Sequence, residues 1–274
     1  MIKSIIFTDL DGTLLDENYS FRMAEGALVL IENRRIPLVI CSSKTRAEIE
    51  LYRRRLNNKH PFIAENGGGV FVPRGYFPVD ADLSGFTLIA DAGYQVIRLG
   101  TGYAELRRAM QELRHEGFEV KGFGDMSVEE VSQLTGLSPD EATASKERDF
   151  DEPFLFQGNR VQLPFLYQAI RKKGLRFTEG RLLHVLGESD KGKAVALLSA
   201  LYQAKYGEII TIGIGDSPND IPMLKSVDYP IIVKHPDGTF DSRIHLGWVI
   251  KADGVGPEGW NKAVIEIMSC LGTV

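Results

Sequence analysis

Apolar and polar positions follow one another in blocks along the chain, and these blocks predict strands and helices in turn. Short β-branched runs at residues 5–8 and 36–41 are typical of strands buried in a parallel sheet. Each run is followed by a stretch with helical spacing, at residues 21–33 and 45–56. Strands that alternate with helices indicate βαβ units, and therefore an α/β fold with a parallel sheet.

The pattern changes in the middle of the chain and then returns. Between residues 85 and 186 short strands are predicted at 94–99, 154–157, 175–178 and 182–186, and helices at 103–116, 128–135, 139–146 and 163–173. The last stretch is predicted to hold a helix from residue 191, strands at 209–214, 230–233 and 247–250, and a closing helix at 257–271. The chain is therefore expected to form a discontinuous core, residues 1–84 and 187–274, with an α/β domain inserted at 85–186.

Composition narrows the classes of partner. The net charge of −5 and the isoelectric point near 5.6 argue against nucleic-acid binding, which needs a basic patch. No apolar run approaches the length of a membrane span, and Asp9 and Asp11 interrupt the first apolar run, so no signal peptide is expected. Two cysteines, Cys41 and Cys270, do not make a disulfide framework. These features predict a cytoplasmic protein without nucleic-acid or membrane partners, and they leave the oligomeric state open.

Two carboxylates stand at the end of the first predicted strand. Asp9 and Asp11 lie two residues apart, where parallel sheets bind ligands, and Gly12 and Thr13 can turn and tie the loop. A carboxylate can attack phosphorus to give an aspartyl-phosphate, and Asp11 can protonate the leaving alkoxide and later take a proton from water. The alternative is an ordinary turn, because Asp and Gly are common after strands.

An anionic nucleophile must approach a phosphate dianion, so positive charge is needed at this site. Asp216 follows the strand predicted at 209–214 and can complete a magnesium site with Asp9 and the main-chain carbonyl of Asp11. Magnesium keeps several waters, so few protein ligands suffice. The alternative is a capped helix with Pro218 in its first turn.

Three further residues are candidates for binding the phosphate, and a fourth is a candidate for orienting one of them. Lys191 opens a helix, where its charge opposes the macrodipole unless an anion lies nearby; the alternative is a solvated surface lysine. Ser42 follows the second strand and can donate to a phosphoryl oxygen, or can simply cap the next helix. Asn219 can reach the phosphate, and Asp220 can orient Lys191.

These segments, in this order, resemble the motifs of the haloacid dehalogenase superfamily of phosphohydrolases; they are DLDGT (9–13), Ser42, Lys191 and GDSPND (215–220). The resemblance implies a Rossmann-like core with an inserted α/β cap. It also implies Asp9 as the nucleophile, Asp11 as the acid/base, Lys191 as a catalytic cation, and Mg²⁺ at Asp9, Asp11 and Asp216. Because the dehalogenases lack the second aspartate, its presence points to a phosphatase or a phosphomutase.

Three longer segments resemble the mannosyl-3-phosphoglycerate phosphatase family, in the sugar-phosphatase branch; they are CSSKTRAE (41–48), MSVEEVSQLTGLSPDEA (126–142) and RDFDEPF (148–154). This resemblance implies that phosphate is released from mannosyl-3-phosphoglycerate to give mannosylglycerate, a compatible solute. A glucosyl analogue, or a substrate of the sucrose-phosphate type, is the alternative. The two rival functions are a sugar phosphomutase and a non-catalytic magnesium- or ligand-binding regulator.

A substrate of this kind carries a carboxylate and sugar hydroxyls beside its phosphate. Arg148 can grip the carboxylate in bidentate fashion, with Ser43 and Lys44 near the phosphate. Asp151 and Glu152 can accept hydrogen bonds from sugar hydroxyls, unless RDFDEPF is only a charged loop that enters a strand. The five histidines show no metal-ligand spacing and are predicted to be surface or satisfied residues; they are His60, His115, His184, His235 and His245. Gly67–Gly69 is predicted to be a tight turn or hinge.

Overall fold

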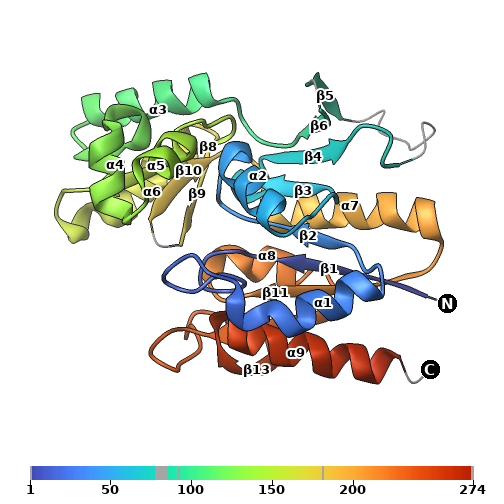
Figure 1. Cartoon of the computed structure of the whole chain (residues 1–274). Helices are drawn as coiled ribbons and strands as arrows, with labels where there is room; N and C mark the ends of the chain where they lie inside the picture. Colours follow the sequence, from blue (N-terminus) through green and yellow to red (C-terminus); the bar gives the residue numbers. More distant parts are fainter. Residues whose placement is uncertain (1, 78–85, 92, 181, 273–274) are drawn as a thin grey trace.

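The central sheet of the molecule is parallel, with the strand order β13-β12-β11-β1-β2 (Figure 1). The computed structural model describes residues 2–77, 86–91, 93–180 and 182–272. The strands of the central sheet are β1 (Lys3–Thr8), β2 (Leu38–Ile40), β11 (Ile209–Gly215), β12 (Tyr229–Lys234) and β13 (Ile250–Val255). The predicted α/β fold with a parallel sheet is confirmed.

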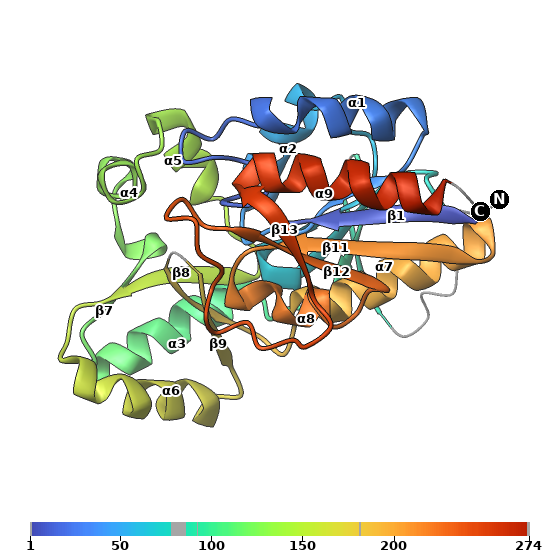
Figure 2. The same cartoon turned by 90° about the horizontal axis from the view of Figure 1, so that it is seen from below.

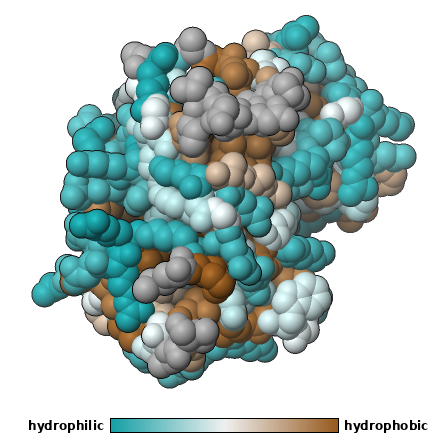
Figure 3. Space-filling model, turned by 90° about the vertical axis from the view of Figure 1, so that its right-hand side faces the viewer, coloured by the Kyte–Doolittle hydropathy of each residue, from teal (hydrophilic) through white to brown (hydrophobic). Residues whose placement is uncertain are grey.

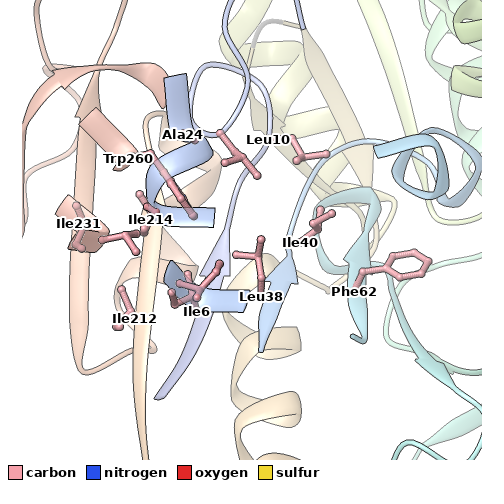
Figure 4. Close-up of a cluster of buried hydrophobic side chains, with 14 of the residues drawn as sticks. Ile6, Leu10, Ala24, Leu38, Ile40, Phe62, Ile212, Ile214, Ile231 and Trp260 are labelled. Atoms are coloured by element: carbon pink, nitrogen blue, oxygen red, sulfur yellow. The ribbon is translucent and has the colours of Figure 1, made fainter. Parts of the chain in front are cut away.

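Helices cover both faces of this sheet; they are α1 (Glu25–Asn33), α2 (Arg46–Arg55), α7 (Lys191–Tyr206), α8 (Ile221–Leu224) and α9 (Gly256–Leu271). In Figure 2, α1 and α9 lie together on one face while α7 lies on the other. Side chains of β1 alternate between the two layers: Ile6 packs with Trp260 of α9 (Figure 4), whereas Ile5 packs with Ala194 of α7. Burial on both faces explains why the strand sequences are almost continuously apolar.

A second, antiparallel sheet extends the core beyond β2, with the strand order β3-β4-β6-β5. Its strands are β3 (Phe62–Ala64), β4 (Gly69–Pro73), β5 (Thr87–Ala90) and β6 (Tyr94–Arg98). Cys41, just after β2, forms a parallel bridge with Ile63, and this bridge joins the sheet to the core. Strand β6 pairs with β4, and β5 pairs with β6. The start of the insertion at residue 85 stays a prediction. Leu88 and Ile89 on the edge strand β5 are exposed, and Figure 3 shows hydrophobic residues gathered on that side of the molecule.

The cap is built on a third sheet, with the strand order β7-β8-β10-β9. Its elements are α3 (Tyr103–His115), β7 (Val120–Gly122), α4 (Val128–Thr135), α5 (Pro139–Ser145), β8 (Asp151–Phe156), α6 (Leu163–Lys172), β9 (Arg176–Glu179) and β10 (Leu183–Leu186). Helices α3 and α6 pack on one side of the sheet, and α4 and α5 form a separate small core with Leu155 of β8. The chain passes from the second sheet into the cap through Gly100, and it passes from the cap to α7 of the core through Gly187. These crossings lie against each other, because a Cβ at Gly187 would come within 2.3 Å of Thr101 Oγ1.

Short 3₁₀ turns complete the chain; they are η1 (Arg22–Ala24), η2 (Glu65–Gly67), η3 (Phe123–Asp125), η4 (Arg160–Gln162) and η5 (Pro218–Asp220). The strand predicted at 247–250 is wrong in position, since the strand begins at Ile250. The preceding residues instead form a buried patch, in which Ile244 and Leu246 pack with Leu224 and Ile232. Among the described residues, no helix is both long and apolar enough to cross a membrane.

Candidate active site

The polar residues at the strand ends converge at one edge of the central sheet. Asp9 follows β1 and Asp216 follows the neighbouring β11, while Ser42 lies just beyond β2 on the other side of β1. Lys191 reaches them from the first turn of α7, and its Nζ lies 2.8 Å from Asp9 Oδ1. The parallel topology therefore brings together residues that are almost 200 positions apart in the sequence.

Lys191 is almost fully buried and is held between two carboxylates. Its Nζ also donates to Asp220 Oδ1 at 2.6 Å, while Asp220 Oδ2 accepts from the main-chain N–H groups of Asp216 and Ser217. Burial alone would lower the pKa of Lys191, but Asp220 and Asp9 outweigh it and raise that pKa above its usual value. Asp220 thus orients the lysine and also shapes the loop that carries Asp216.

Asp9, Asp216 and Asp220 place carboxylate oxygens within 4.8 Å of one another, an arrangement that could hold a metal ion. Burial raises the pKa of Asp9 to about 8; Lys191 opposes the shift, and the charges of Asp220 and Asp216 add to it. One ammonium group therefore does not balance this cluster, and a divalent cation fits the charge that is missing. Asp220 uses its two oxygens for Lys191 and for the main-chain N–H groups of Asp216 and Ser217.

The loop after β1 needs glycine where it approaches Asp216. Gly12 adopts a φ of 76°, and a Cβ there would lie 2.8 Å from Asp216 Oδ2. The next residue, Thr13, donates its hydroxyl to Asp216 Oδ1 at 2.8 Å. The turn after the first strand and the loop after β11 are thereby fitted to each other.

Asp11 forms an ion pair with Lys44. Lys44 Nζ lies 3.0 Å from Asp11 Oδ2 and 3.6 Å from Glu48 Oε1, and it stands over the ring of Tyr52 at 5.7 Å. Asp11 Oδ1 is buried and has no hydrogen-bond partner among the described residues. Thr45 caps α2 through a capping box with Glu48, and this cap fixes the start of the helix beside Lys44. The acid/base candidate therefore has one paired oxygen and one unpaired oxygen.

The two remaining phosphate candidates lie on either side of the cluster. Ser42 is fully buried, and its hydroxyl accepts from the main-chain N–H of Lys44 at 3.3 Å. Asn219 donates to Asn66 Oδ1 at 3.1 Å, and its own Oδ1 is buried without a partner among the described residues. The roles of both residues toward a phosphate stay predictions.

The cap residues predicted to read the substrate mostly bind other protein groups. Arg148 is buried and donates to the carbonyls of Ser145 and Ser43, at 3.0 and 2.9 Å. Asp151 is fully buried, and Glu152 accepts from Arg107 at 2.6 Å as well as from other cap groups. Arg148 thus connects the cap to the core, and Glu152 stabilises the interior of the cap; direct substrate contact by these residues stays a prediction.

Two histidines and one asparagine contact site residues that sequence spacing did not connect. His184 of β10 lies 2.8 Å from Asp151 Oδ1, and Asn66 donates to Asp151 Oδ2 at 2.6 Å. His235 Nε2 lies 3.3 Å from Asp216 Oδ2, and the hydrogen bond to Asp216 raises the pKa of His235 to about 9. These partners come from distant segments, so a search for local motifs has no signal for them.

A buried lysine between two aspartates, at the carboxyl edge of a parallel sheet beneath an α/β cap, defines a class of hydrolase. The chain matches the haloacid dehalogenase-like hydrolases over residues 6–78 and 172–238, and it belongs to that family. Its curated relatives place it among the phosphatases of the family.

Three of these relatives carry more particular names. A glucosyl-3-phosphoglycerate/mannosyl-3-phosphoglycerate phosphatase of Methanococcoides burtonii is 43% identical over 97% of this chain and 98% of its own length. The protein of the same name from Persephonella marina is 42% identical, over 97% of each chain. The mannosyl-3-phosphoglycerate phosphatase of Pyrococcus furiosus is 36% identical, over 84% of this chain and 90% of its own. The identification as a member of this phosphatase group, made from the motifs, is confirmed.

Solved structures of low sequence identity share the fold. Protein 0175 of Thermoplasma acidophilum matches with a TM-score of 0.67 at 15% identity, and the match covers 100% of both chains. The sucrose-phosphatase of Synechocystis sp. PCC6803, solved with sucrose and phosphate, matches with a TM-score of 0.61 at 13% identity over 99% of each chain. At these identities the likeness shows the core-and-cap architecture alone.

Proposed function

We propose that this protein is a magnesium-dependent phosphatase that releases phosphate from mannosyl-3-phosphoglycerate and from its glucosyl analogue. The observation that carries the proposal is the placement of Lys191 Nζ, 2.8 Å from Asp9 and 2.6 Å from Asp220, with the carboxylate of Asp216 in the same cluster. The names of relatives that align over nearly the whole chain support this pair of substrates.

In the first step Asp9 is the nucleophile. One of its carboxylate oxygens forms a bond to phosphorus while the bond from phosphorus to the ester oxygen breaks. Asp11 gives a proton to that ester oxygen, so that the oxygen leaves as a neutral hydroxyl group of the sugar-glycerate. Lys191 remains beside Asp9 and balances the charge that gathers on the phosphoryl oxygens.

In the second step water attacks the aspartyl-phosphate. Asp11, now deprotonated, takes a proton from the water while the new bond to phosphorus forms. The bond between phosphorus and the Asp9 oxygen breaks, so the Asp9 carboxylate is restored and inorganic phosphate leaves. Lys44, 3.0 Å from Asp11, holds the acid/base carboxylate in place through both steps.

Asp9, Asp216 and the main-chain carbonyl of Asp11 would hold the magnesium ion. When bound, Mg²⁺ supplies positive charge that offsets the repulsion between the nucleophile and the phosphate. The crowding of the three carboxylates and the raised pKa of Asp9 support a divalent cation at this place.

The cap, which we place between Gly100 and Gly187, closes over the phosphate and supplies substrate contacts. Lys44, whose Nζ lies 3.0 Å from Asp11, supplies positive charge beside the phosphate. Ser42 and Asn219 bind phosphoryl oxygens. The remaining residues assigned to substrate binding are Ser43, Arg148, Asp151 and Glu152. A cytoplasmic location and a small-molecule substrate complete the proposal.

A phosphate-release assay with Mg²⁺ tests this function on mannosyl-3-phosphoglycerate, glucosyl-3-phosphoglycerate, sucrose 6-phosphate and simple sugar phosphates. We expect the two phosphoglycerates to be preferred, EDTA to abolish release, and Asp9→Asn to lose about 10³-fold or more in kcat while it still folds. An isomerised sugar phosphate without free phosphate would establish a mutase instead. Full activity of Asp9→Asn would remove Asp9 from the nucleophilic role.

A further inference from the structure

A cavity with both polar and apolar walls lies beside the reaction site, between the cap strand β9 and the first turn of α7. Its volume is about 210 Å³, and its walls include Arg176 and Thr178 from the cap and Ser189 and Asp190 from the core. At roughly 30 Å³ per water molecule, this is the space of about seven waters. The cavity can therefore take one small polar group, such as a single sugar ring, but not a large ligand.

The sheet register directs the two cap side chains toward the core. Arg176 and Thr178 pair with Leu186 and His184 on β10, and side chains at paired positions point to the same face. The ring of the alternating residue Phe177 stacks on Tyr167 of α6 at 3.7 Å, and Phe177 also borders the cavity. β9 thus presents a guanidinium and a hydroxyl toward the catalytic side.

Two polar atoms of the cavity residues have no partner. Ser189 Oγ and Asn219 Oδ1 are both buried and make no hydrogen bond to any described residue. Both residues line the cavity. Buried polar groups are nearly always hydrogen-bonded, so two such atoms at one cavity indicate that a ligand or water completes them. This observation is independent of the shape of the cavity.

The charges of the cavity favour hydroxyl groups over an anion. Arg176 NH1 lies 3.2 Å from Asp190 Oδ2, so the guanidinium charge is already balanced. The other oxygen of Asp190 accepts from the main-chain N–H of Lys193 at 2.9 Å. An added carboxylate or phosphate would meet the charge of Asp190, whereas a hydroxyl can donate to the carboxylate and accept from Thr178 or Arg176.

The cavity also reaches the reaction centre. Lys191, which binds Asp9, and Asn219, a predicted phosphate ligand, border it. A substrate whose phosphate lies at Asp9 can therefore extend into the cavity. We infer that Thr178, Arg176, Ser189, Asp190 and Asn219 form a subsite for the sugar ring of the substrate, an inference that rests on the proposed function.

Paired substrates test the subsite. Thr178→Val removes one hydroxyl from β9 and keeps the shape of the side chain, and Ser189→Ala removes the unpaired hydroxyl of the core. We expect the ratio of kcat/KM for mannosyl-3-phosphoglycerate to that for 3-phosphoglycerate, which lacks the sugar, to fall about tenfold in each variant. Thr87→Val, the same replacement in the exposed strand β5, is the matched control and should leave the ratio unchanged.

The readouts separate this inference from the proposed function. Wild-type protein that releases no phosphate from either glycosyl-phosphoglycerate would overturn the function, whatever the variants do. If wild type is active, an unchanged ratio in Thr178→Val and Ser189→Ala, or an equal loss on both substrates, would overturn the subsite alone. A loss confined to the sugar-bearing substrate supports it.

Discussion

Lys191 is the residue on which the geometry of the site most depends, because its buried ammonium group joins the loops of the site. It has 1% of its surface exposed and donates to carboxylates from two different loops, those of Asp9 and Asp220. A buried ion pair is costly to form, but removal of one partner leaves the other charge uncompensated. The lysine is therefore expected to matter for the stability of the fold and, under the proposed function, for catalysis.

We predict that Lys191→Met abolishes turnover and lowers the free energy of unfolding by about 3–5 kcal/mol, because two buried carboxylates lose their cation. Lys193→Met is the matched control: Lys193 lies on the same turn of α7, but it is exposed and its ammonium group donates to the carbonyl of Glu188. Steady-state kinetics and urea denaturation measure both effects. Similar losses in the two variants would show that the helix, and not the buried charge, is responsible.

The turn η2 shows at the scale of an element why this segment is rich in glycine. Glu65, Asn66 and Gly67 all have positive φ, at 51°, 53° and 87°, and all are buried. A Cβ at Gly67 would lie 2.2 Å from the carbonyl oxygen of Asp190, and one at Gly68 would lie 2.3 Å from Phe150 Cβ. The predicted tight turn is present. Its glycines allow Asp190, at the start of α7, and Phe150, just before β8, to pack against it.

We predict that Gly67→Ala destabilises the protein by clearly more than Gly117→Ala. Gly117 has a similar φ of 92° but no heavy atom near its missing Cβ, so alanine there costs only about 1–2 kcal/mol of left-handed strain. Alanine at Gly67 adds a collision with the backbone that carries Asp190, and this shifts Lys191 as well. Denaturation and phosphatase assays of both variants give the comparison. Equal costs would mean that the backbone relaxes around the new methyl group.

At the scale of the whole molecule, buried polar contacts dock the cap onto the core. The carboxylate of Glu65 accepts from the main-chain N–H groups of Asp149 and Phe150, at 2.8–3.1 Å. Thr45, which is the N-cap residue of the core helix α2, donates its hydroxyl to the carbonyl of Ala144 near the end of the cap-domain helix α5, at 2.9 Å. The position of the cap is thus tied to the same loops that hold Lys44 and the reaction site.

Burial raises the pKa of Glu65 from its ordinary value of 4.5 to about 8, although Arg148 opposes the shift. Between these two pH values the folded protein keeps a proton that the unfolded chain has released, so this group's contribution to stability is lost as the pH rises. We predict that the free energy of unfolding of wild type, relative to Glu65→Gln, falls between pH 5 and 8 and then levels off.

Urea denaturation of both proteins at a series of pH values measures this difference, and the other titrating groups cancel in it. Glu147→Gln, at an exposed glutamate between α5 and β8, is the matched control for the loss of a carboxylate. If the difference in unfolding free energy between wild type and Glu65→Gln does not change with pH, the proton affinity of Glu65 is the same in the folded and unfolded states.

The sequence alone determined the fold class and the members of the strand-end cluster. Strand, turn and helix signals are local, so Asp9, Ser42 and Asp216 could be assigned to the ends of parallel strands before any contact was known. Parallel strands share one carboxyl edge, and this geometric fact carries such residues to one place. Local signals did not find β3, β4, β5 or β7, because these short strands are defined by their partners rather than by their own periodicity.

Only the tertiary structure decided what each polar group meets. Arg148 and Glu152 look like free ligands in a charged segment, yet folding buries them against carbonyls and an arginine. His184 contacts Asp151, and the cavity beside β9 joins residues from four separate segments. Such contacts depend on which face of a strand is covered and on how two sheets pack, and neither is encoded within any short stretch of chain.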